Sequence, residues 1–231
     1  MAAGDDRMPV ILYLADPMCS WCWGFSPVIG ELAEDYADRA DLRVIAGGLF
    51  PGTAEPMDRH FKASVREHWE HVEQRTGQPF DFSFFERDDF VYDTEPACRA
   101  VVAARELDRS RVLEMLRGLH HAFYAENRDI TERGVATEVA ADVGIDADRF
   151  CAALESDTIR DRMRHDFRLA HELGMRGFPT LMGYDHERVA LLTEGYAPAD
   201  RVREALEQWL TQVEPETTAT GNEFCEGMRN E

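Results

Sequence analysis

The sequence has little positive charge and almost no lysine. Its 231 residues include 45 acidic and 25 basic side chains, which gives a formal net charge of -20. Lys62 is the only lysine. Nucleic acids and anionic membrane surfaces attract proteins through clustered basic side chains. The charge therefore predicts that the protein binds neither a nucleic acid nor a membrane.

Long apolar runs are also missing. The first residues contain no apolar segment behind basic residues, as a secretory signal would require. No stretch approaches the roughly 18 apolar residues typical of a membrane-spanning helix. The apolar run at residues 10–15 is only long enough for a strand. We therefore expect a cytoplasmic protein, and a chain of this length can bury a sizeable core.

Cysteine is scarce, and its spacing is uneven. The chain has five cysteines. In a reducing compartment, disulfides rarely serve as structural cross-links, and an isolated close pair is more often catalytic or metal-binding. The five are Cys19, Cys22, Cys98, Cys151 and Cys225, and only the first two lie close together in the sequence. The pair Cys19 and Cys22 is therefore the first candidate for a functional site.

The close pair lies between a predicted strand and a predicted helix. The apolar run Val10 to Ala15 is typical of a strand buried on both faces. From Ser20 the apolar residues return to helical spacing, and a second strand is expected at residues 42–46. This is a β-α-β unit in which the cysteines stand where the first strand gives way to its helix.

A helix N-terminus suits a reactive thiol. Its unpaired backbone N–H groups and the helix dipole stabilise a thiolate. Cys19, on the outermost turn, is expected to be exposed and to attack a disulfide. Cys22, one turn further into the helix, is placed to resolve the resulting mixed disulfide.

Two other interpretations of the pair remain open. A zinc site needs further soft ligands, but the other cysteines are single and widely spaced. His68 and His71 share one helix face, yet no third ligand is evident near them. Buried packing explains one cysteine better than two flanked by tryptophans. Cys98 and Cys151 are themselves expected to pack in apolar helix faces.

Helical patterns fill the middle of the chain, and strand patterns return only near its end. Thr94 and Ser110 are expected to cap two of the helices. A polar, aperiodic remainder carrying Cys225 is expected to form a mobile tail. Strands are expected at 180–184 and 188–192, with a turn at 185–186, and helices at 58–75, 94–107, 110–123, 132–143, 146–154, 158–173 and 198–210.

Two short motifs resemble one protein family. The stretch Cys19-Ser-Trp-Cys22, with Pro27 five residues beyond it, resembles the active-site helix of the thioredoxin superfamily and its kinking proline. The segment Gly-Phe-Pro-Thr at residues 177–180 resembles the cis-proline segment that faces the cysteines there. The helices between the two motifs resemble the insertion of the DsbA family. Within it, the chain looks most like the cytoplasmic, FrnE-like predicted disulfide isomerases.

The resemblance implies an α/β, thioredoxin-like fold with a large all-helical insertion. The thioredoxin-like domain would be discontinuous, with residues 8–54 and 174–212. The inserted helical domain would cover residues 55–173. Residues 213–231 would form the mobile tail.

The resemblance also implies a thiol-disulfide oxidoreductase or isomerase that acts on protein or peptide disulfides and requires no cofactor. Trp21 and Phe178 would belong to an apolar rim around the sulfurs. Pro179 and Thr180 would help to bind an extended substrate segment, which the backbone of Phe178 would take up by strand addition. Two further aromatic residues of the first helix, Trp23 and Phe25, are expected to be buried.

Two alternative functions share parts of this description. Kappa-class glutathione transferases and 2-hydroxychromene-2-carboxylate isomerases have the same architecture and use glutathione, which would then be a redox co-substrate here. Those proteins typically have a serine in the active position, so Cys22 argues against that alternative. The other alternative is a chaperone or binding module whose cysteines only sense redox state.

Overall fold

The computed structural model describes residues 8–185 and 188–213 and has one four-stranded sheet at its centre. The strand order is β2-β1-β3-β4. β1 is parallel to β2 and antiparallel to β3, and β3 is antiparallel to β4. The strands are β1 (Val10–Ala15), β2 (Asp41–Ala46), β3 (Thr180–Tyr184) and β4 (Val189–Glu194).

The register explains why β1 is an unbroken apolar run. Tyr13 pairs with Val44 of β2 on one side and with Leu181 of β3 on the other. A strand in the middle of a sheet covered on both faces has no solvent side on which to alternate polar residues. Helix α1 (Ser20–Asp35) connects β1 to its parallel neighbour, as the β-α-β prediction requires.

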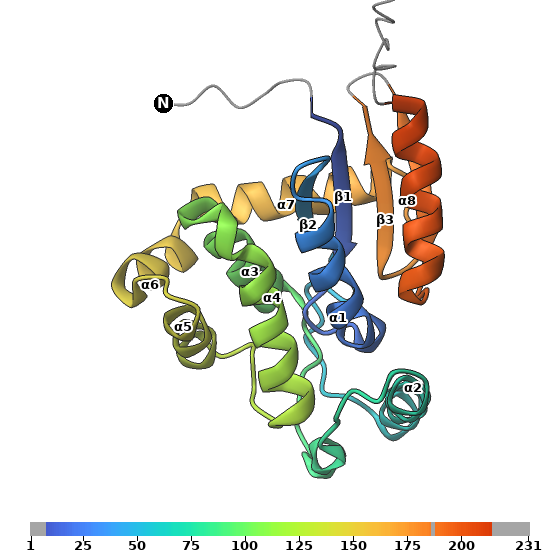
Figure 1. Ribbon diagram of the computed structural model, residues 1–231. Helices are drawn as coiled ribbons and strands as arrows, with labels where there is room; N and C mark the ends of the chain where they lie inside the picture. Colours follow the sequence, from blue (N-terminus) through green and yellow to red (C-terminus); the bar gives the residue numbers. More distant parts are fainter. Residues whose placement is uncertain (1–7, 186–187, 214–231) are drawn as a thin grey trace, which may run out of the picture.

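Helices occupy the chain between β2 and β3. Figure 1 shows α3 to α6 grouped on the side of β2, α7 running across the strands, and α8 (Ala199–Val213) beside β3. No helix in the described part of the chain is long and apolar enough to cross a membrane. The intervening helices are α2 (Arg59–Thr76), α3 (Glu95–Leu107), α4 (Val112–His120), α5 (Arg133–Asp142), α6 (Ala147–Glu155) and α7 (Asp157–Glu172).

This order of strands and helices is the thioredoxin-like arrangement with helices inserted that the sequence predicts. The division into two domains, at residues 55 and 173, stays a prediction. The expected tail from residue 214 onward, including Cys225, lies outside the described residues, as does the expected turn residue His186.

One of the two predicted helix caps is correct in position, and the other is wrong. Thr94 is the N-cap residue of α3, but its side chain makes no capping hydrogen bond; its Oγ1 instead accepts a hydrogen bond from the Phe50 N–H at 3.1 Å. Ser110 does not begin the next helix, because Asp108 accepts bonds from both the N–H and the hydroxyl of Ser110 and holds a 3₁₀ turn, Arg109–Arg111. The expected continuous helix to residue 123 also ends early.

That early end is a change of helix type. α4 stops at His120, and a π-helical turn, His121–Ala125, follows directly. Single π turns inserted in helices occur often at functional sites. Here the turn follows a histidine that reaches the cysteine loop.

One buried ion pair joins the inserted helices to the sheet. Arg105 of α3 donates to both carboxylate oxygens of Asp166 in α7, at 2.7 and 3.1 Å. The same guanidinium donates to the Val44 carbonyl at 2.9 Å, and Asp166 accepts from the Ala46 N–H at 3.0 Å. Both side chains of the pair are largely shielded from solvent. Two helices are therefore bonded to the edge strand β2 through one bidentate contact.

Candidate functional site

Cys19 is the N-cap residue of α1. Its backbone is extended, with φ -95° and ψ 113°, and its Sγ accepts a hydrogen bond from the Cys22 N–H at 3.4 Å. Both cysteines are free thiols. The sulfur of Cys19 therefore takes the position that an oxygen acceptor usually fills at a helix N-terminus, where negative charge is stabilised.

The expectation that Cys19 is exposed is wrong. Only 6% of Cys19 is accessible to solvent, and none of Cys22 is. The Cys19 N–H donates to the Asp16 carbonyl at 3.1 Å, which holds the start of the helix against the end of β1. Met18 is buried in the same turn. A disulfide can therefore meet only a small exposed part of the Cys19 residue.

Burial gives Cys22 a different chemical character. Its removal from water, and then the hydrogen bond and charge of the Cys19 sulfur, raise the pKa of Cys22 well above its ordinary value. Tyr13 of β1 lies beside it: burial, and then the charges of Cys22 and Cys19, raise the pKa of Tyr13. Cys22 is therefore a protonated thiol at pH 7.

A buried carboxylate, Asp16, organises the loop before the cysteines. Its Oδ1 accepts from the Met18 N–H at 2.8 Å, and its Oδ2 accepts from the Leu49 N–H at 2.7 Å and the Cys98 thiol at 3.3 Å. Burial raises the pKa of Asp16, against the effect of the two N–H donors. Cys98 is buried, as predicted, but it also bonds to this carboxylate.

Two further buried side chains hold backbone carbonyls of the same loop. The Nε2 of His120 lies 3.1 Å from the Asp16 carbonyl, and the Tyr92 hydroxyl donates to the Met18 carbonyl at 2.6 Å. Burial lowers the pKa of His120 to about 4, so the ring is neutral at pH 7. A neutral ring facing a carbonyl carries its proton on Nε2.

The proline segment lies beside the cysteine loop. The Phe178–Pro179 peptide bond is cis, as the resemblance implies. Thr180 opens β3 and pairs with Leu14 of β1, so Pro179 adjoins the end of β1 from which the loop leaves. The Thr180 hydroxyl donates to the Gly177 carbonyl at 2.7 Å and holds the turn before the strand.

The aromatic residues expected to form an apolar rim differ in their burial. The Phe178 ring packs over Gly47, where an added Cβ would lie 1.8 Å from its Cε1, and only 9% of Phe178 is exposed. Trp21 is half-buried, and its ring centroid lies 5.7 Å from that of Tyr196. Trp21 therefore forms a partly exposed aromatic pair with Tyr196, a residue that sequence reasoning missed, whereas the Phe178 ring is buried and does not form an exposed rim.

The remaining predicted residues show no further site. Trp23 and Phe25 are buried, as expected. Cys151 is half-buried, and its sulfur lies 3.2 Å from the Thr137 hydroxyl. Among residues 8–185 and 188–213, no three His, Cys, Asp or Glu side chains are grouped as metal ligands.

Comparisons with known proteins agree with this geometry. Residues 10–207 match the family described as a DSBA-like thioredoxin domain. The structure is similar to that of a candidate protein disulfide isomerase from Nitrosomonas europaea, at 35% identity and TM-score 0.84, over 89% of this chain and 98% of that one. It is also similar to the cytosolic disulfide reductase DsbM from Pseudomonas aeruginosa, at 32% identity and TM-score 0.73, over 88% and 99%.

Relatives found by sequence have a different description. The ClpXP adapter protein SpxH of Bacillus subtilis is 28% identical over 94% of this chain and 73% of its own length. The SpxH of Bacillus licheniformis is 27% identical over 80% of this chain and 61% of its own length. The chain thus spans about three fifths to three quarters of these relatives.

Proposed function

Because this chain belongs to the DSBA-like thioredoxin domain family, we propose that it exchanges disulfides with protein or peptide substrates through Cys19 and Cys22. The observation that carries the proposal is the placement of the Cys19 sulfur. It lies at the N-terminus of α1, within reach of the Cys22 N–H, at the point where β1 ends beside the proline segment of β3.

The reaction follows from the different environments of the two thiols. The Cys19 thiolate attacks one sulfur of the substrate disulfide, a mixed disulfide forms, and the other substrate sulfur leaves as a thiolate. The Cys22 thiolate then attacks the Cys19 sulfur, an intramolecular disulfide forms, and the second substrate sulfur leaves. Two electrons pass to the substrate, and the reverse sequence oxidises a dithiol.

Substrate recognition is assigned to the surface around the Cys19 sulfur. The backbone beside Pro179, including that of Phe178, takes up an extended segment by strand addition, with Thr180 holding the turn. Trp21 supplies apolar contact next to the sulfur. The packing of the Phe178 ring on Gly47 supports a backbone role for that residue.

The solved neighbours support a place of action and an electron donor. DsbM is described as cytosolic, which supports the expectation that this chain also acts in the cytoplasm. A second structure of DsbM, at 32% identity and TM-score 0.69, contains GSH, which is glutathione. Glutathione is therefore proposed as the redox co-substrate, and no tightly held cofactor is required.

An adapter role is the second candidate function. It is favoured by the relatives named as ClpXP adapters. An adapter binds its partner stoichiometrically and without a thiol, whereas an oxidoreductase turns over and depends on Cys19. A single variant, Cys19→Ser, therefore distinguishes the two functions: it should abolish disulfide exchange and leave adapter binding intact.

The test is a trapping experiment in cells. Cys22→Ser should still attack substrates but fail to release them, so mixed disulfides through Cys19 should accumulate. Cys19→Ser should trap almost nothing, and Cys151→Ser serves as the matched control that retains both functional thiols. Partners recovered with Cys19→Ser as efficiently as with the unmodified protein would instead support the adapter role.

A further inference from the structure

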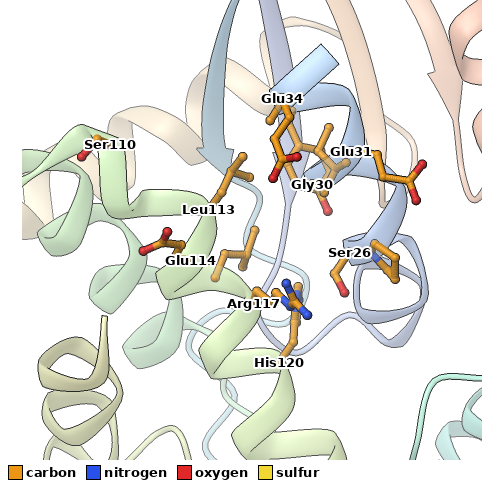
Figure 2. Close-up of a pocket in the computed structure, with 14 residues that line it drawn as sticks. Ser26, Gly30, Glu31, Glu34, Ser110, Leu113, Glu114, Arg117 and His120 are labelled. Atoms are coloured by element: carbon orange, nitrogen blue, oxygen red, sulfur yellow. The ribbon is translucent and has the colours of Figure 1, made fainter. Parts of the chain in front are cut away.

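A cavity of about 540 Å³ lies between α1 and α4. Figure 2 shows side chains from both helices around it, with His120 and Arg117 from α4 and Ser26 and Glu34 from α1. The side chains Glu31, Glu34 and Glu114 are exposed and mark its mouth, whereas Tyr13 and His120 are fully buried and mark its inner end. The cavity thus runs from the surface into the core.

Two polar atoms of the inner end are not fully paired. Among the described residues, the His120 Nδ1 makes no hydrogen bond, and the Tyr13 hydroxyl has a side-chain contact only with the Cys22 thiol. With its proton on Nε2, His120 presents Nδ1 as an acceptor. Buried polar atoms of folded proteins are normally paired, and a polar cavity of this size has room for water that would pair them.

The inner end lies directly behind the resolving cysteine. The Tyr13 ring is 5.9 Å from that of Phe25, which is three residues after Cys22 and so shares its face of α1. The His120 ring is 6.2 Å from that of Trp23, the residue after Cys22. The Cys22 thiol itself is within hydrogen-bonding reach of the Tyr13 side chain, which lines the cavity.

The mouth opens away from the substrate side. Glu31 and Glu34 follow Cys22 by nine and twelve residues, which places them roughly 13–18 Å further along the helix. Substrate meets the protein at the opposite end of α1, where the Cys19 sulfur lies. A protein bound at Cys19 thus covers the front of the site and leaves the rear cavity open.

Cys22 needs such a route because it is fully buried and must lose a proton before it can resolve the mixed disulfide. Building on the proposed function, we propose that the α1–α4 cavity is the proton exit of the resolving step, with Tyr13 as the relay. The Cys22 proton passes to the Tyr13 oxygen while the Tyr13 proton passes to cavity water. His120 Nδ1 accepts a hydrogen bond from that water and orients it. The proton leaves to bulk solvent at Glu31 and Glu34, and the Cys22 thiolate attacks the Cys19 sulfur.

A symmetrical nitroaryl disulfide separates the two chemical steps. One coloured thiolate leaves when Cys19 attacks, and a second leaves when Cys22 resolves, so stopped-flow absorbance records each step. The measurement uses a Cys151→Ser/Cys225→Ser background, so that neither of these two thiols contributes to the signal. Tyr13→Phe removes only the hydroxyl; it should slow the second release by about tenfold or more and leave the first within about twofold.

A second variant blocks the cavity without touching Tyr13. Gly30 lines the cavity, and a Cβ added there would meet no atom within 4 Å, so Gly30→Leu adds a bulky side chain to the cavity lining without a clash at its Cβ. The matched control is Gly134→Leu, the same change at an exposed helical glycine outside the cavity lining. Only Gly30→Leu should selectively slow the second release.

The outcomes separate the relay from the proposed function. If the unmodified protein gives two releases and neither Tyr13→Phe nor Gly30→Leu changes the second, the relay is wrong and the dithiol function stands. Equal slowing of both releases also overturns the relay, because it indicates general damage to the site. If the unmodified protein never gives a second release, the proposed dithiol function itself fails.

Discussion

Asp16 is the residue with the most varied contacts at the site, since its carboxylate accepts from two backbone N–H groups and a thiol. Asp16→Asn would place an amide N–H₂ against one of these donors. We expect the free energy of unfolding to fall by about 1–3 kcal/mol, the cost of an unsatisfied buried donor. Urea denaturation followed by circular dichroism measures it.

Asp81→Asn is the matched control for this substitution. Asp81 also accepts from the residue two positions on, Ser83, but its hydrogen bonds are exposed to solvent. Its substitution should cost less than about 1 kcal/mol. Equal losses for the two variants would contradict the organising role given to Asp16.

His120 makes stability depend on pH in a defined direction. Its pKa is about 4 in the folded protein and about 6.5 in an unfolded chain, so between these values only the unfolded chain takes up the proton. The free energy of unfolding should therefore fall as pH drops from 6.5 to 4, by about 3 kcal/mol from this group. The free energy of unfolding is measured for the unmodified protein and for His120→Gln between pH 6.5 and pH 4, and the difference between them isolates the contribution of His120.

Glutamine keeps a donor for the Asp16 carbonyl but does not titrate. The raised pKa of Asp16 has the opposite effect on stability, because it favours the folded state at low pH. This effect is the same in the unmodified protein and in His120→Gln, so it cancels in the comparison. The stability difference between the two proteins should thus narrow or reverse toward pH 4. A pH-independent difference would show that His120 is not held neutral by burial.

The residues that could be predicted from sequence are those with a local signal. The spacing of Cys19 and Cys22 after an apolar run is visible within a few residues. His120 contacts the Asp16 carbonyl, which is 104 positions away in the sequence. The sequence around a histidine in an apolar helix does not indicate such a contact. The sequence predicts Tyr13 only as part of a strand, because a buried tyrosine is an ordinary core residue.

Among the elements, the loop after β2 packs closely against the proline segment. A Cβ at Gly47 would lie 1.8 Å from the Phe178 ring, so Gly47→Ala must displace Phe178. We expect a loss of stability of about 1–3 kcal/mol, as for other overpacked sites, and slower attack on a peptide disulfide. Turnover of a peptide disulfide and urea denaturation measure the two effects.

Gly134→Ala is the control for that prediction. An added Cβ there meets no atom within 4 Å, and alanine favours a helix, so its stability should stay equal or rise by up to about 1 kcal/mol. Full activity and stability in Gly47→Ala would mean that the Phe178 ring moves freely and does not fix the proline segment.

Element positions were more predictable than their ends. Hydrophobic periodicity located the four strands and the main helices, since it reports which face of each element is buried. Thr94 is at the N-cap position of α3, but its hydroxyl accepts from the distant Phe50 N–H instead of capping the helix. Ser110 is not a cap, because the neighbouring Asp108 accepts from its N–H and hydroxyl. The π turn after α4 has no sequence signal that periodicity detects.

For the whole molecule, the Arg105–Asp166 pair links α3 and α7 to each other and to strand β2. Arg105→Met would leave a buried carboxylate without its cation and should lower the free energy of unfolding by about 3–5 kcal/mol. Arg201→Met breaks an exposed pair with Glu204 in α8 and should cost less than about 1 kcal/mol. Denaturation of both variants provides the comparison, and similar small losses would show that the α3–α7 contact does not hold the helices in place.

The overall arrangement was predicted through resemblance and not through physics alone. Periodicity separates strands from helices, but nothing in the pattern of β1 specifies β3 as its neighbour rather than β4. The motif at residues 177–180 predicted only that the start of this strand faces the cysteines, as its family counterpart does, and the pairing of β3 with β1 is a finding of the structure. The hydrogen bond from the Ala46 N–H to Asp166 joins residues 120 positions apart, and no local sequence pattern predicts it.

The position of β1 at the centre of the sheet has a consequence for protein synthesis. β1 and β2 leave the ribosome early, but β3, which must pair with the other side of β1, begins only at Thr180. At about 5–20 residues per second, the delay is on the order of ten seconds. For that time the apolar edge of the nascent β1 faces the cell without its proper neighbour, and such edges pair readily with other chains. The ribosome-bound chain is therefore the form of this protein that most needs a chaperone, with residues 10–15 as the segment to be shielded.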